Sequence, residues 1–255
     1  VSVGHISRPE EFKRAFAVAT VHDFFNLLSV LVLFPLQLTT NVLGISSSYL
    51  GDSFQQVGGM KLLNPLKLIV NPTVAAITDV AAESGTTMFV ISIVLLFIAL
   101  RYIVVNLKQL VIGRVEQFFD ALLFKNAARA MLLGLVLTVM VQSSSITTSL
   151  VVPLAGAGIL TLRQIFPMTL GANIGTTITA ILAALVTGHP AAVTVAFAHL
   201  LFNVFGIVVI WPIRRIPLYL SETLAEWSIR SKLIPLAYVG LVFFLIPLVL
   251  IYFVG

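Results

Sequence analysis

The sequence has 255 residues, of which 59% are hydrophobic and only 10% are charged, and its mean hydropathy is +1.08. Soluble globular proteins carry about 25% charged residues, so this composition excludes a water-soluble domain and predicts an all-α integral membrane protein. The net charge of +5 does not indicate nucleic-acid binding, because the basic residues lie between apolar runs, where they set membrane orientation.

Apolar segments long enough to span a bilayer are expected at residues 15–36, 86–105 and 233–254. Residues 44–85 hold only two Lys or Arg, so this linker, including the loop expected at "GISSSYLG" from Gly44, should face outside. The segments 101–129 and 214–232 hold five and four, so they should face the cytoplasm. The prediction is a multi-pass protein of the plasma or inner membrane.

The predicted organisation has five parts. They are the end of a first repeat (1–43), the outside linker (44–85), a connecting span with an amphipathic segment (86–125), a second repeat (126–213), and an interfacial segment with a C-terminal span (214–255). Within the second repeat, residues 164–213 carry no formal charge and are too long for one helix. Pro167, Gly171, Gly175, Gly188 and Pro190 are expected to divide them.

The stretch "VQSSSITTSL" places one amide and six hydroxyl side chains between apolar flanks: Gln142, Ser143, Ser144, Ser145, Thr147, Thr148 and Ser149. A broken helix at membrane depth exposes backbone N–H groups, which favour anions, while hydroxyl and amide oxygens accept cations. The segment is therefore expected to bind an oxyanion and sodium side by side. The alternative is that small Ser and Thr residues only allow close helix packing.

The stretch "GANIGTTIT" follows in the same repeat. Asn173, Thr176 and Thr179 share a helical face at i, i+3 spacing, and they are candidate ligands for the same site. Gly171 and Gly175 suggest a helix start with close backbone approach. Packing is again the alternative interpretation.

An earlier part of the chain has a similar polar helical face, which is formed by Thr20, Asp23 and Asn26. A carboxylate inside a span is costly and is by default functional, so Asp23 is a candidate cation ligand. It could instead lie near the inner interface and pair with Lys13, Arg14 or another cation of a loop. His22 and His199 are expected to form hydrogen bonds between helices rather than to relay protons.

An internal repeat relates the two regions. "VATVHDFFNLLSVLVLFPL" from Val18 and "VAFAHLLFNVFGIVVIWPI" from Val195 share seven of 19 residues without a gap, including a His-x-x-x-Asn spacing. The first copy should run from inside to outside and the second from outside to inside, as in inverted-repeat secondary transporters. Only the second copy follows a QSSS segment, so the chain is expected to be a partial transporter whose partner QSSS repeat precedes residue 1.

The motifs "VQSSS", "GANIGTTITAILAAL" and "AFAVATVHDFFNLLSVLVLFPL" resemble those of the type II sodium/phosphate cotransporters. The resemblance implies sodium-coupled symport of inorganic phosphate without an organic cofactor. It implies that phosphate is held by Gln142, Ser143, Ser144 and Ser145, and that sodium binds at Thr176, Thr179 and Asp23. The polar faces described above add Asn173 as a candidate phosphate ligand and Thr20, Asn26 and Ser143 as candidate sodium ligands. Asp23, which follows Ala17 and Ala19 in the pattern of electrogenic members, implies net inward charge. The short linker without cysteines favours a bacterial source.

Two other readings stay open at this point. The chain could carry another anion, such as sulfate or a dicarboxylate, although a dicarboxylate site would be expected to contain an Arg that the charge-free stretches lack. It could also be a non-transporting membrane subunit, although such a subunit needs no hydroxyl clusters. No nucleophile–base pair or metal cluster is evident in the sequence, so an enzyme is not expected.

Overall fold

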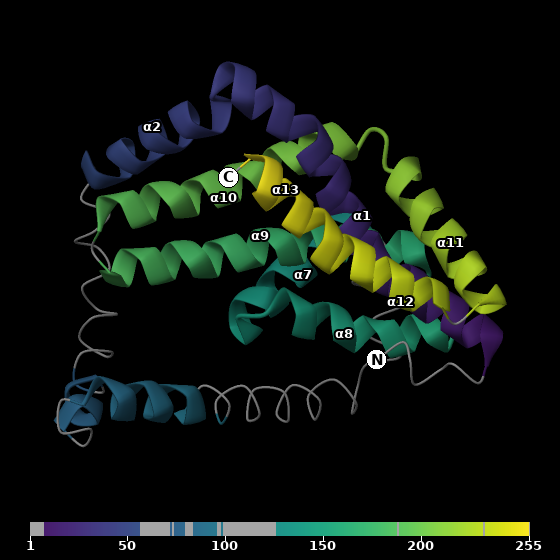
Figure 1. Ribbon diagram of the computed structural model, residues 1–255, viewed down its shortest axis with the longest axis horizontal. Helices are drawn as coiled ribbons and strands as arrows, with labels where there is room; N and C mark the ends of the chain where they lie inside the picture. The colour runs from purple at the N-terminus through teal and green to yellow at the C-terminus, as the bar shows by residue number, and fades with distance from the viewer. Residues whose placement is uncertain are drawn as a thin grey trace.

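The computed structural model describes residues 8–56, 72, 74–79, 84–95, 98, 126–187, 189–231 and 233–254. All regular structure in these residues is helical, which confirms the all-α prediction. The main helices are α1 (Pro9–Thr40), α2 (Val42–Gln56), α7 (Ala127–Val141), α8 (Ser144–Gly156), α9 (Leu162–Thr187), α10 (Pro190–Ile210), α11 (Arg215–Arg230), α12 (Leu233–Gly240), η3 (Leu241–Leu245) and α13 (Ile246–Val254). Figure 1 shows their arrangement.

Four helical stretches of the described residues are long and apolar enough to cross a membrane: Pro9–Thr40, Leu162–Leu185, Pro190–Ile210 and Leu233–Phe253. The first contains the span expected at residues 15–36, and the last covers all but the final residue of the span expected at 233–254. Of the span expected at 86–105, the structure describes a helix over Gly85–Leu95 and the single position Ile98. The amphipathic segment lies outside the described residues up to position 125.

Two interpretations of local sequence were wrong. The segment "GISSSYLG" is not a loop, because it lies inside α2, which packs against α10 through Gly51 and Thr194 and through the Phe54 and Phe197 rings. Residues 164–213 do form two helices, but the break falls between Thr187 and Pro190. Pro167, Gly171 and Gly175 lie inside the continuous helix α9, so the two glycines do not mark a helix start.

The glycines serve helix packing instead. α9 lies beside α10 as the second of two long green helices (Figure 1), and α7 crosses its other side. A Cβ atom at Gly171 would lie 1.8 Å from the carbonyl oxygen of Met131, and one at Gly175 would lie 2.7 Å from that of Leu135. Such close backbone approach is typical of small-xxx-small packing in membranes, and it fixes α7 against α9.

We expect Gly171→Ala to destabilise this crossing strongly. The added methyl group meets backbone, which cannot rotate away, so α7 and α9 must separate, at a cost of about 3 kcal/mol. The check is the midpoint of thermal unfolding in detergent. Gly240→Ala is the matched control, because a Cβ there meets no atom within 4 Å. Equal midpoints for the two variants would show that the crossing is not as tight as described.

The core lies where α1 meets α8, α9 and α10. Buried apolar side chains of α1, such as Val18 and Phe25, pack on α9, where the rings of Phe25 and Phe166 meet edge to face at 6.4 Å. α1 crosses α10 at Gly206, where a Cβ would lie 2.7 Å from Ser29 Oγ. α11 packs along the first half of α1, and the Lys13 ammonium donates to the Glu226 carboxylate at 2.6 Å.

The last span contains a π-helical turn over Leu241–Leu245, directly before α13. Pro247 follows this turn by two residues and has no N–H group for the helical ladder. A π-turn before a proline absorbs the missing hydrogen bond while the helix continues. The described side chains of this span are largely exposed in the chain, as expected for a helix whose neighbours are lipid or another segment.

Candidate functional site

The QSSS stretch forms the tip of a helical hairpin. α7 ends at Val141, Gln142 adopts the left-handed conformation with φ 57°, and α8 begins at Ser144. Ser143 is the N-cap of α8, and its Oγ accepts a hydrogen bond from the Ile146 N–H at 3.3 Å. Serine is a preferred N-cap, whereas a left-handed glutamine is uncommon and strained. Such strain is characteristic of functional sites.

The two helices of the hairpin are too short to span a bilayer. α7 has 15 residues and α8 has 13, so they extend about 22 Å and 20 Å, against a hydrocarbon core of about 30 Å. The hydroxyls of Thr138 and Thr147 join them through a buried hydrogen bond of 3.0 Å. Neither helix alone is long enough to cross a bilayer, and the broken helix predicted at this position is present.

The side chains at the tip differ in accessibility. Gln142 and Ser145 are exposed, and Ser143 and Ser144 are half-buried. The first N–H groups of α8, those of Ser144 and Ser145, belong to the amides that a helix leaves without an intrahelical partner. The tip can therefore offer backbone N–H, hydroxyl and amide groups to an anion at the positive end of the α8 dipole.

The other end of α8 is held by a cation. The Arg14 guanidinium donates to the carbonyl oxygen of Ala155 at 3.2 Å and to that of Gly156 at 3.0 and 2.7 Å. These carbonyls carry the negative end of the helix dipole, so a positive charge stabilises them. Arg14 thus fixes the C-terminal end of α8 to α1, while the N-terminal end stays open.

A second polar cluster joins α1 to α9. His22 Nε2 contacts Asn173 Oδ1, Asn26 Nδ2 lies 3.2 Å from the same nitrogen, and Asn173 Nδ2 donates to Asn26 Oδ1 at 3.1 Å. The expectation that His22 forms a hydrogen bond between helices is confirmed. No hydrogen bond between described residues joins Asn173 to the QSSS tip.

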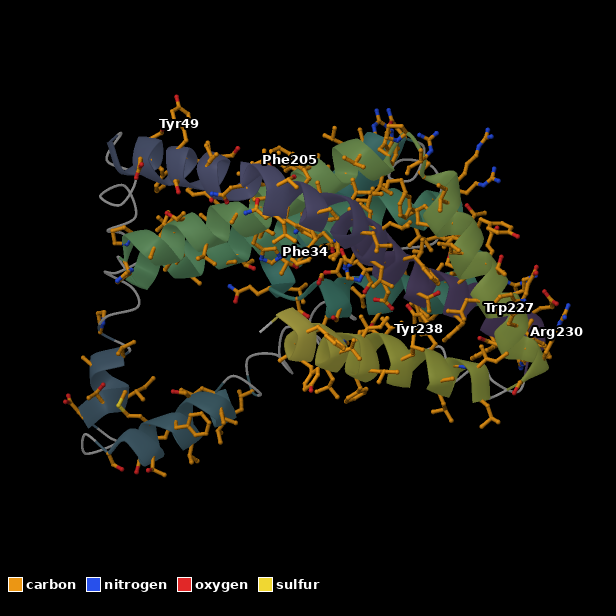
Figure 2. All side chains as sticks on the ribbon, turned by 45° about the horizontal axis from the view of Figure 1, so that its top comes forward. Phe34, Tyr49, Phe205, Trp227, Arg230 and Tyr238 are labelled. Carbon is orange, nitrogen blue, oxygen red and sulfur yellow. The ribbon has the colours of Figure 1, made fainter. Side chains whose placement is uncertain are left out.

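Asp23 turns to a different neighbour. Its carboxylate accepts a hydrogen bond from the Tyr238 hydroxyl of α12 at 3.1 Å, and His22 Nδ1 lies 3.7 Å from it. Figure 2 labels Tyr238, which lies on α12. The alternative partners do not reach Asp23, because Lys13 pairs with Glu226 and Arg14 binds the end of α8. Tyr238 was missed from sequence, where its only signal is a hydroxyl inside an apolar span.

The three candidate threonines use their hydroxyl protons within their own helices. Thr20 donates to Phe16 O, Thr176 to Ala172 O and Thr179 to Thr176 O. Each oxygen keeps lone pairs that can accept a cation, but Thr20 is only 3% exposed. The helical face that the sequence predicted on α1 is therefore divided between different neighbours. Asn26 faces α9, Asp23 faces α12, and Thr20 is buried.

Comparisons with known proteins identify related sequences. A family model described as Na+/Pi-cotransporter matches residues 95–229. The chain is 29% identical to "Sodium-dependent phosphate transport protein 2B" of Pongo abelii. The alignment is 344 residues long and covers 97% of this chain and 50% of that protein. The chain is also 29% identical to "Sodium-dependent phosphate transport protein 2A" of Ovis aries over 316 residues, covering 93% and 50%.

The chain thus spans about half the length of the curated relatives it matches. No solved structure matches it. These relatives are mammalian proteins and give no support to a bacterial source.

Proposed function

Since the chain belongs to the Na+/Pi-cotransporter family, we propose that it forms one half of a membrane transporter that carries inorganic phosphate into the cell together with sodium. The named activity of the relatives belongs to proteins about twice the length of this chain. The proposal therefore concerns a protein in which a second QSSS repeat completes the site.

One observation carries the phosphate part of this proposal: the break at Gln142 between two half-length helices. It brings the N–H groups of α8, the Gln142 amide and the Ser143, Ser144 and Ser145 side chains to membrane depth without a formal charge. Neutral donors can bind an oxyanion and still release it, as a carrier requires.

The His22, Asn26 and Asn173 cluster supports a sodium site. Nε2 of His22 faces both amides, and a ring nitrogen either donates or accepts. The nitrogen can therefore bond to both amides only if both present an oxygen to it or both present an amino group. In either case Asn26 and Asn173 also present atoms of the same kind to each other, oxygen to oxygen or nitrogen to nitrogen. If the Asn173 amide is turned over from the orientation given above, both amino groups face an unprotonated Nε2. The two amide oxygens then converge where Asn173 Nδ2 otherwise donates to Asn26 Oδ1, and a cation bound between them relieves their repulsion.

Asn173 is therefore proposed as a sodium ligand and no longer as a phosphate ligand. Asn26 stays a proposed sodium ligand, and Ser143, Thr176 and Thr179 stay proposed ones through their oxygen lone pairs. Thr20 is the weakest member of the set, because its hydroxyl is buried within α1. Asp23 is the only proposed ligand with a formal charge, so it is the one suited to an additional sodium ion.

The crossing of α1 and α10 supports the inverted repeat. In the ungapped alignment of the two copies, Ser29 corresponds to Gly206, and these two residues meet at the crossing. A helix pair related by a two-fold axis makes contact at equivalent positions when the axis passes between them. A pseudo-two-fold axis here would place the partner QSSS tip opposite the one in this chain.

Charge distribution supports the orientation. The start of α9, the end of α10 and the start of α11 meet near Arg163, Arg214 and Arg215, and the start of α1 contributes Lys13 and Arg14 beside the end of α8. We assign this basic end to the cytoplasm of a plasma or inner membrane. The α7–α8 hairpin would then enter from the cytoplasmic side and return to it.

The deciding test is uptake of radiolabelled phosphate into liposomes that contain the full-length protein. We expect uptake under an inward sodium gradient, none when potassium replaces sodium, and no inhibition by excess sulfate or succinate. Uptake blocked by either competitor would identify a different anion as cargo. Absence of sodium-dependent uptake in folded protein would reject the proposed transport.

A further inference from the structure

A basic pocket of about 490 Å³ lies at the end of the bundle where α7, α9 and α11 begin. Its walls include Arg163 of α9, Trp211 after α10, and Arg214, Arg215 and Tyr219 at the start of α11. It lies away from the QSSS tip, and none of its lining residues belongs to the proposed phosphate or sodium ligands. The proposed transport mechanism leaves it without a role.

The charge of the pocket is strongly positive. Three guanidinium groups line it, against the single carboxylate of Glu222. Within the described part of the chain, no ion pair uses any of the three, and the Arg214 guanidinium lies 4.6 Å over the Trp211 ring in a cation–π contact. Arginine in this setting offers fork-shaped donors that match phosphate oxygens. The first turns of α9 and α11 add the positive ends of two helix dipoles.

The surface next to the pocket is apolar and aromatic. On α11, Ile216, Tyr219 and Trp227 recur at helical spacing and are 44%, 66% and 54% exposed. The opposite face, which includes Leu218 and Ala225, is buried in the bundle, largely against α1. A helix with an exposed aromatic stripe beside arginines is typical of one that lies in the membrane interface. The pocket therefore opens at the depth of lipid headgroups.

We propose that this pocket binds the phosphate headgroup of an anionic phospholipid in the cytoplasmic leaflet. The guanidinium groups of Arg163, Arg214 and Arg215 contact the phosphate, and the exposed stripe of α11 contacts the start of the acyl chains. The leaflet assignment rests on the membrane orientation given under the proposed function. The site and its ligand class do not depend on transport.

The test measures lipid retention by native mass spectrometry of the delipidated protein after incubation with dioleoyl phosphatidylglycerol or dioleoyl phosphatidylcholine. We expect selective retention of phosphatidylglycerol. Each arginine near an anionic lipid adds to its affinity, so Arg214→Gln with Arg215→Gln should lower retention about 30-fold. Arg8→Gln with Arg230→Gln removes the same charge outside the pocket, and it should retain the lipid (Arg230 is labelled in Figure 2).

Equal loss in both double variants would overturn the proposal, because nonspecific charge would then explain retention. Displacement of the lipid by millimolar inorganic phosphate would also overturn it, since the pocket would then bind free phosphate. Thermal unfolding of each variant in detergent verifies that a loss of lipid does not come from a loss of fold. Retention needs no transport, so a protein that fails to carry phosphate can still pass this test.

Discussion

Replacement of Gln142 by alanine is expected to reduce apparent phosphate affinity by about 10- to 100-fold, the loss of one hydrogen bond to a charged ligand. Alanine and glutamine both carry a Cβ, so the strain of the left-handed position at φ 57° is unchanged, and the α7–α8 break should persist. The measurement is sodium-dependent phosphate uptake in liposomes as a function of phosphate concentration.

The matched control is Gln37→Ala, which removes an amide that contacts Asn41 and Leu43 at the far end of α1. It should leave phosphate affinity unchanged. Ser143→Ala should also reduce uptake, and it additionally removes an N-cap worth about 1 kcal/mol of stability. Normal uptake in both tip variants would mean that the polar residues of the tip serve helix packing and not phosphate binding.

Asp23→Asn is expected to abolish the transport current while sodium-dependent uptake of phosphate continues. The amide keeps the size of the side chain and can still accept the hydrogen bond from Tyr238, but it lacks the charge that favours an additional sodium ion. One net charge per cycle corresponds to about 2.3 kcal/mol at 100 mV. Its loss should lower the phosphate gradient sustained at that voltage by about 50-fold.

Current and tracer uptake are measured together on the same membranes, so that charge per phosphate is obtained directly. Asp52→Asn removes a carboxylate on the exposed face of α2 and should leave the ratio of charge to phosphate unchanged. An unaltered ratio in Asp23→Asn would reject the charge-coupling role of Asp23. Loss of both current and uptake would show instead that the carboxylate is needed for transport itself.

Local sequence predicted the helix break at Gln142 well. Serine at position 143 prefers to cap a helix, and the apolar flanks on both sides define two half-length helices, so the break at Gln142 follows from short-range preferences. The polar segment at residues 214–232, for which the sequence left a helix or a loop open, contains the helix α11. His22 was expected to form a hydrogen bond between helices because this is the usual role of such a histidine, but its partner Asn173 was not identified.

Other features depend on residues far apart in the chain. Asn173 meets Asn26 across 147 residues and Tyr238 meets Asp23 across 215, so no local pattern could assign these pairs. The glycines at 171 and 175 were misinterpreted as a helix start, because a glycine required for close packing and a glycine that ends a helix look the same in sequence.

The sequence by itself determined that this protein is a helical membrane protein, that a polar break separates two helices at Gln142, and that the chain resembles the Na+/Pi-cotransporter family. These properties follow from composition and from interactions within a few residues of each other. Only the tertiary structure decided that Asn26 and Asn173 meet at His22, that Asp23 faces Tyr238, and that three arginines line one pocket. The direction of a side chain between helices is set by which helix packs against it, and that depends on the packing of the whole bundle.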